Sequence, residues 1–354
     1  MKLSFISSQA IQNAMRQTIR QAQNEMSSAS TEATTGVYAD IGVSLGSNTS
    51  LSVNLTREVS RIDSILGSNS IANQRMTTSQ TALTGMGSNA QKLMDQLVAL
   101  RGNTDSNSIA LTQQLATSTL SSVIASANVM VNGEYLFAGT NTDVQPMTDK
   151  SASTTADIQT KLGAYASTLY PSASPPSSAI GQLTGAQIKS FITTTVEPMF
   201  TSDAGWSQWS SASDQNMTSR ISNTDVVETS TNSNSAGMRY LALATSVTNA
   251  LMNTTPALSQ DALSAVTDQA ISYSRQAIDG LNNQASQLGL SQSRLSDANT
   301  TLNAQKTILN TNIGDLTGVD PYEASTKVNS LQTQLETAYT IVSKIQQLSL
   351  VNYL

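Results

Sequence analysis

A heptad pattern runs without a slip through residues 62–100, and it constrains the fold more than any other feature of the sequence. It places mostly apolar residues in alternating steps of three and four: Ile62, Ile65, Asn69, Ala72, Met76, Ser79, Leu83, Met86, Ala90, Leu93, Leu97 and Leu100. This spacing is that of a coiled-coil seam, in which one stripe of a helix faces a partner helix. At 1.5 Å per residue such a helix is about 60 Å long. The sequence therefore predicts a mainly α-helical protein built around a long helical bundle.

Two further stretches repeat this helical spacing. After Arg101-Gly102-Asn103, where Gly102 is a plausible helix end, a second helix is predicted over 109–130, and the turn signal Asn132-Gly133 ends it. Closer to the C-terminus, leucine recurs at every seventh position: Leu281, Leu288, Leu295, Leu302, Leu309 and Leu316. The companion seam positions of this ladder are mixed in polarity, which favours packing within one bundle over a two-chain zipper.

Both ends of the chain are predicted to be amphipathic coiled-coil helices. The C-terminal one begins at Asp320-Pro321, because aspartate can cap the free N–H groups of the first turn and proline fits its first position. A lone pair of such helices buries too little apolar surface to offset the entropy lost on ordering them. We therefore predict that the termini become ordered when copies of the chain pack around them. The assembly interface is predicted to contain the large apolar residues of both ends: Ile11, Met15, Ile19, Met26, Leu331, Leu335, Val342, Ile345 and Leu348. From the pattern alone, an ordinary bundle with no role in assembly stays open.

The middle of the chain, residues 140–235, differs in composition from both ends. It holds five of the seven prolines and both tryptophans, Trp206 and Trp209. Proline is excluded from long helices, and the segments 217–221 and 225–229 are short and β-prone. We predict an inserted small mixed domain that is rich in strand and loop. The predicted divisions are a tail helix with an irregular linker (1–48), bundle helices with a hairpin (49–139) and the insert (140–235). A returning bundle helix (236–318) and a second tail helix (319–354) follow.

Composition argues against catalysis and against several kinds of ligand. The chain contains no histidine and no cysteine, so the commonest general base, metal ligand and thiolate nucleophile are missing. The acids Glu134, Asp143 and Asp149 lack the spacing of a calcium loop and are expected to be solvated. A net charge of −6 without a basic run argues against nucleic acid. No apolar stretch is long enough to cross a membrane, and the first residues lack the apolar core of a secretory signal. We predict no enzymatic activity and no cofactor; location in the cytoplasm and export without a cleaved signal both stay open.

The segment Asn132–Thr140, which follows the predicted helical pair, resembles a known family. Its residues Gly133, Tyr135, Leu136, Phe137 and Gly139 match the Gly-x-Tyr-Leu-Phe-Ala-Gly stretch of the hook-associated protein 3 family, the hook–filament junction branch of the flagellin superfamily. The C-terminal segments 331–339 and 348–354 are similar to the tail of the same family. Together the resemblance covers about 140 residues at the start and about 100 at the end of the chain.

This resemblance implies a structural component of the bacterial flagellum that forms the junction layer between the hook side and the filament. Such a protein is exported through the flagellar type III apparatus and is extracellular. Its implied partners are itself, the hook-side junction protein, flagellin and an export chaperone, with no nucleic acid and no membrane. Two alternatives are kept: a filament flagellin, and a secreted glycan-binding protein that would use Trp206 and Trp209.

Overall fold

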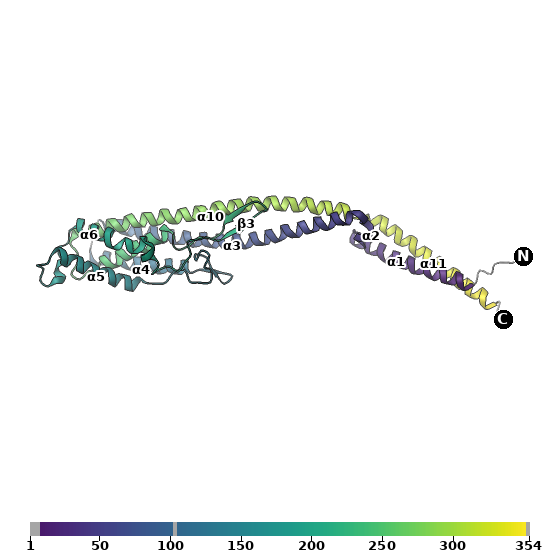
Figure 1. Ribbon diagram of the computed structural model, residues 1–354, viewed down its shortest axis with the longest axis horizontal. Coiled ribbons are helices and arrows are strands. Elements are labelled where there is room, and N and C mark those ends of the chain that lie inside the picture. Colours follow the sequence, from purple (N-terminus) through teal and green to yellow (C-terminus); the bar gives the residue numbers. More distant parts are fainter. Residues whose placement is uncertain (1–7, 102–104, 352–354) are drawn as a thin grey trace. The chain divides into compact units, whose positions relative to one another are not determined.

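Long α-helices dominate the computed structural model, which describes residues 8–101 and 105–351 (Figure 1). The chain divides into two units, one made of Met1–Ser64 with Thr301–Leu354 and the other of Ile65–Thr300. Helices α3 (Thr49–Leu100) and α10 (Gln260–Thr317) contribute residues to both. The two small antiparallel sheets confirm a mainly α fold with a small β region.

The first unit brings the two ends of the chain together. Helix α1 (Ser8–Thr35) packs antiparallel against α11 (Pro321–Val351). Asp320 caps α11 as predicted, since its Oδ1 accepts a hydrogen bond of 2.8 Å from the N–H of Tyr322. Backbone hydrogen bonds also join the two connecting segments, from Tyr38 N–H to the Thr317 carbonyl (3.0 Å) and from Val319 N–H to the Gly36 carbonyl (2.9 Å).

The linker after α1 was predicted to be irregular, and this prediction was wrong for its second half. Residues Ile41–Leu45 form the short helix α2, which continues into the 3-10 turn η1 (Gly46–Asn48). The Asp40 side chain caps α2 by accepting a hydrogen bond of 3.0 Å from Val43 N–H. The glycine content hid this helix, because a single capped turn leaves no heptad pattern.

The second unit holds the main hydrophobic core. Helix α4 (Ser106–Ala127) follows α3 and leads into the hairpin of β1 (Met130–Val131) and β2 (Glu134–Tyr135). Helix α9 (Ala236–Leu251) packs against α4, and the nearly complete burial of its side chains puts it at the centre of this unit. The heptad prediction for residues 62–100 is confirmed, because all its seam positions except the half-buried Ile65 are buried. Of the leucine ladder, Leu281, Leu288, Leu295 and Leu302 are buried, while Leu309 and Leu316 are half-buried.

The insert contains strands within the two segments predicted to be β-prone, and helices that were not predicted. Strands β3 (Thr218–Arg220) and β4 (Val226–Glu228) pair antiparallel, with Ser219 opposite Val227. The additional elements are α5 (Ser151–Leu169), η2 (Pro176–Gln182), α6 (Gly185–Phe191), the π-helical turn η3 (Ile192–Val196), α7 (Pro198–Thr201) and α8 (Asp203–Trp206). Apart from α5 these helices are one or two turns long, which is too short to show a helical period in sequence.

Both tryptophans belong to the core of the insert. Trp206 and Trp209 are 1% and 2% exposed, and their rings stack with centroids 6.4 Å apart. The indole N–H of Trp206 donates a hydrogen bond of 3.0 Å to Asn234 Oδ1, and the Arg239 guanidinium lies 5.8 Å from the ring centroid. Neither ring presents a free face to solvent, so the tryptophans cannot stack on a glycan in this structure.

Two glycines set a close crossing between α9 and α10. A Cβ atom on Gly280 would lie 2.5 Å from the backbone nitrogen of Gly237, and one on Gly237 would lie 2.6 Å from the nitrogen of Leu281. Real Cβ atoms do not approach backbone this closely, so any side chain at either position would push the helices apart. This contact could not be seen in the sequence, where the two glycines lie in ordinary helical context.

Candidate assembly site

The pair formed by α1 and α11 has a very small core of its own. Only four of its described side chains are buried together: Ala22, Ala29, Leu331 and Leu335. Ile19, Met26 and Val328 pack around them and remain partly exposed. Two of the four buried residues are alanines, which contribute little apolar area, so the pair gains little stability from its own packing.

The residues predicted to form an assembly interface lie at graded exposures along this pair. Leu331 and Leu335 are each 6% exposed and form its core, while Ile19 and Met26 border that core. Met15, Val342 and Ile345 are half-buried, and Ile11 is 40% exposed. The side chain of Leu348 lies outside the described part of the structure. That these residues contact other molecules stays a prediction.

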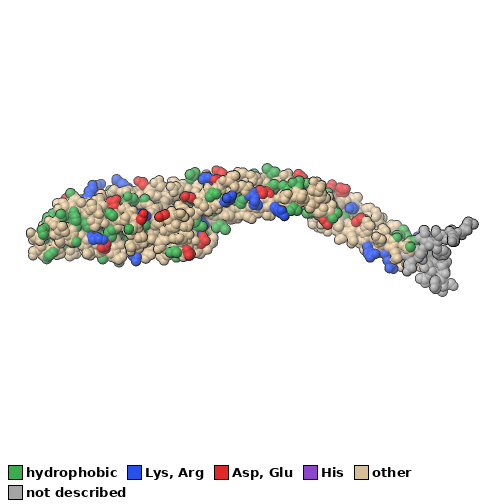
Figure 2. All heavy atoms as spheres, in the orientation of Figure 1, with side chains coloured by type: hydrophobic (Ala, Val, Ile, Leu, Met, Phe, Trp, Pro, Cys, Tyr) green, Lys and Arg blue, Asp and Glu red, His purple; other side chains and the backbone are tan. Residues whose placement is uncertain are grey.

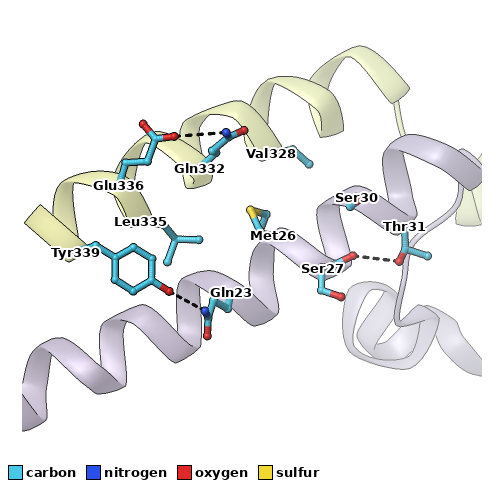
Figure 3. Close-up of a pocket in the computed structure, with 10 residues that line it drawn as sticks. All are labelled: Gln23, Met26, Ser27, Ser30, Thr31, Val328, Gln332, Leu335, Glu336 and Tyr339. Carbon is cyan, nitrogen blue, oxygen red and sulfur yellow. Dashed lines mark hydrogen bonds between the residues drawn. The ribbon is translucent and has the colours of Figure 1, made fainter.

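A groove of about 760 Å³ opens between α1 and α11 (Figure 3). Met26 points from α1 and Leu335 from α11 into the space between the helices, and Val328 lines it beside them. Polar groups form the remainder of the wall. Two of them link the helices directly, as Gln23 Nε2 on α1 donates a hydrogen bond of 2.9 Å to the Tyr339 hydroxyl on α11. The groove therefore has apolar surface inside and hydrogen-bonding groups at its edge, a combination that suits a protein surface.

Other large apolar side chains of this unit are exposed. Val43 on α2 and Tyr322 at the start of α11 are 81% and 85% exposed, and Ile341 further along α11 is 40% exposed. Single exposed apolar residues are normal on soluble proteins, but this unit has many of them and a small core. The unit thus combines a small buried cluster between its terminal helices with several exposed large apolar side chains.

The hairpin motif that carries the family resemblance has a structural role inside the second unit. Asn132 and Gly133 have φ of 54° and 84° and form the two-residue turn between β1 and β2. Positive φ at both positions is what such a turn needs, and Asn-Gly is its favoured sequence. Tyr135 is half-buried at the end of β2, and the following Leu136 and Phe137 are 1% and 0% exposed in the main core.

Gly139 fixes the path of the chain after this hairpin. Its φ is 64°, and a Cβ atom there would lie 2.4 Å from the carbonyl oxygen of Ser213 and 2.6 Å from that of Gln215. The neighbouring Ala138 carbonyl accepts a hydrogen bond of 2.9 Å from Ser213 N–H, and the Phe137 carbonyl accepts one of 2.8 Å from Ser233 N–H. The residues that follow β2 thereby hold the segments around Ser213 and Ser233 in place.

A buried arginine supports the hairpin and was missed in the sequence. The Arg75 side chain is only 7% exposed and forms an ion pair with Glu134 of β2. Its second terminal nitrogen lies 3.3 Å from the sulfur of Met217. Glu134 was expected to be a solvated acid. Its side chain is 48% exposed, but its carboxylate also neutralises the buried charge of Arg75. The position of Arg75 next to the seam residue Met76 was the one sign in the sequence that this charge could be buried.

Among residues 8–101 and 105–351, no group of acids could hold a metal ion, and no helix is long and apolar enough to cross a membrane. The pKa of Glu58 is held below its usual value by a hydrogen bond from Arg61, and burial raises the pKa of Tyr273.

The paired ends and the long heptad helices define a mainly helical structural protein whose first and last segments fold together. Residues 6–142 match the N-terminal helical region of bacterial flagellin, and residues 271–354 match its C-terminal helical region. The two matches together cover more than half of the chain, so it belongs to the flagellin superfamily. It is accordingly a structural component of the bacterial flagellum.

Two solved structures match this chain at low sequence identity. A Vibrio parahaemolyticus protein assigned as a flagellar hook-associated protein is 11% identical, with 76% of this chain and 97% of that one covered and a TM-score of 0.53, which shows a shared fold. FlgL of Bacillus cereus is 12% identical, with 73% and 98% covered and a TM-score of 0.49. No curated protein sequence matches this chain.

Proposed function

We propose that this chain forms the junction layer between the hook side and the filament of the flagellum, by assembly of its paired terminal helices. The observation that carries the proposal is the small core of the α1–α11 pair, whose buried cluster has four side chains and lies beside an open groove. A helix pair of this kind is marginal alone and gains most of its stability from neighbours that cover its remaining faces.

The hairpin motif supports a junction protein over a filament flagellin. Tyr135, Leu136 and Phe137 match the hook-associated family in sequence, and the buried side chains that follow β2 give the motif a defined structural task. In this proposal the chain leaves the cell through the flagellar type III apparatus, with an export chaperone as its partner before assembly. Outside the cell it contacts copies of itself, the hook-side junction protein and flagellin.

Deletion of the gene in a motile cell tests this function. We expect hooks without filaments in electron micrographs and unpolymerised flagellin in the medium, because filament subunits would lack the layer on which they assemble. A plasmid copy of the gene should restore filaments and is the matched control. Normal filaments after deletion would contradict the proposal. Growth of the purified chain into long filaments would instead favour the alternative of a filament flagellin.

A further inference from the structure

Charge is segregated along the α1–α11 pair. The half nearer the chain ends, residues 8–21 and 338–351, contains Arg16, Arg20 and Lys344 and no acidic residue. We call this the basic half. The remainder of the pair, residues 22–40 and 320–337, is the acidic half, and its six acids outnumber its one lysine: Glu25, Glu32, Asp40, Asp320, Glu323 and Glu336, with Lys327. The Gln23–Tyr339 hydrogen bond lies at the boundary and aligns the two helices there.

The charges of the basic half lack partners within the described chain. Arg16, Arg20 and Lys344 are exposed, and no described carboxylate forms an ion pair with any of them. Arg16 and Arg20 are four residues apart on one helix face, a spacing at which like charges repel. Figure 2 shows basic side chains on the part of this pair that lies nearer the chain ends. The chain therefore carries a local repulsion that a neighbouring acidic surface would remove.

Apolar exposure is complementary to the charge pattern. The basic half exposes Ile11 and Ile341, each 40% exposed, while the groove with Met26 and Leu335 lies in the acidic half. Glu336 lines this groove, and Glu25 is half-exposed one residue before Met26. Exposed apolar side chains accompany the positive charges, and a groove with an apolar floor accompanies the negative ones, on the same helix pair.

We propose that the basic half of one copy docks against the acidic groove of a second copy, displaced by about 10 Å along the helix axis. This inference rests on the proposed assembly function and specifies its register. Copies aligned without displacement would place like charges side by side, whereas the displaced arrangement brings Arg16 and Arg20 close to Glu25 and Glu336. Each copy uses different surfaces toward its two neighbours, so the contact is head-to-tail and can continue beyond a dimer.

Charge reversal of the full-length chain tests this register. We expect R16E/R20E and E25K/E336K each to weaken self-association about tenfold at low ionic strength, because several exposed ion pairs are lost together. The combined variant with all four changes should return to within about threefold of the wild type, since its halves are complementary again. It should not co-assemble with the wild type, because every mixed contact then opposes like charges. Sedimentation velocity with one chain fluorescently labelled measures both effects.

Two controls make the result specific. R57E reverses an exposed charge on α3 of the same unit and should leave association unchanged. Circular dichroism at a dilution where every chain is monomeric should show the same helix content for all variants, because the reversed residues are exposed or half-exposed. In 1 M salt, where the screening length is about 3 Å, wild-type association should fall toward that of the double variants.

The proposal is overturned if the combined variant stays as weak as the double variants or mixes freely with the wild type. It is also overturned if the wild-type chain stays monomeric or stops at dimers, the latter being the result for an antiparallel closed pair. These outcomes are independent of the gene deletion. If the combined variant associates with itself and not with the wild type, but filaments are normal after deletion, the junction function alone is refuted. If filaments are lost after deletion but the combined variant mixes with the wild type, the register alone is refuted.

Discussion

Leu335→Asp should abolish assembly of this chain while its main core stays folded. Leu335 belongs to the buried four-residue cluster of the α1–α11 pair, and a carboxylate there would be desolvated. Even truncation of a buried leucine costs about 2–5 kcal/mol, which is more than this small core can lose. We expect association to fall at least a hundredfold in sedimentation velocity, with a partial loss of helical circular dichroism from the two terminal helices.

Gln334→Asp is the matched control for this change. It places the same charge one residue earlier on α11, where the side chain is exposed. Its association should stay within about threefold of the wild type, since exposed substitutions of this kind have small effects. The main thermal transition, which comes from the core of residues 65–300, should be the same in both variants. Normal assembly of Leu335→Asp would mean that the terminal pair is not the assembly element.

Gly139→Ala should lower the stability of the second unit by about 3 kcal/mol or more. The residue has a φ of 64°, a conformation that costs a non-glycine residue about 1–2 kcal/mol. The new Cβ would also overlap two backbone carbonyl oxygens, which cannot move aside as the end of a flexible side chain can. For a unit of this size the midpoint of thermal unfolding should fall by roughly 6–12 °C, as measured by calorimetry.

Gly163→Ala provides the comparison at a permissive position. Gly163 lies inside α5, and nothing is within 4 Å of the site of its Cβ. There the same substitution should be neutral or stabilise by about 0.5–1 kcal/mol, because alanine is the better helix former. Equal melting temperatures for the two variants would show that the hairpin motif does not hold the insert in the way described.

The long elements could be predicted from the sequence because their pattern repeats many times. The seam of residues 62–100 and the leucines from 281 to 302 each specify a buried stripe by spacing alone, and so the bundle was predicted correctly. The turn at Asn132-Gly133 and the strands of the insert were found because their residues have strong local preferences.

What the sequence concealed depends on contacts between distant residues. Gly237 meets Gly280, and neither glycine is distinguished by its neighbours in the chain. Arg75 lies beside a seam residue, but nothing in the sequence indicates that its partner is Glu134. The groove of the α1–α11 pair has the same origin. Met26 and Leu335 were both predicted on apolar seams, but only the antiparallel register fixed by Gln23 and Tyr339 shows that they face the same open space.

The account depends on a terminal pair that is marginal in a single chain and stabilised by neighbours. Hydrogen exchange measured in a dilute and in an assembled sample tests this most directly, with α4 as an internal reference. We expect residues 8–35 and 321–351 to exchange rapidly in the dilute sample and slowly after assembly, while α4 is protected in both. Terminal helices as strongly protected as α4 in the dilute monomer would contradict it.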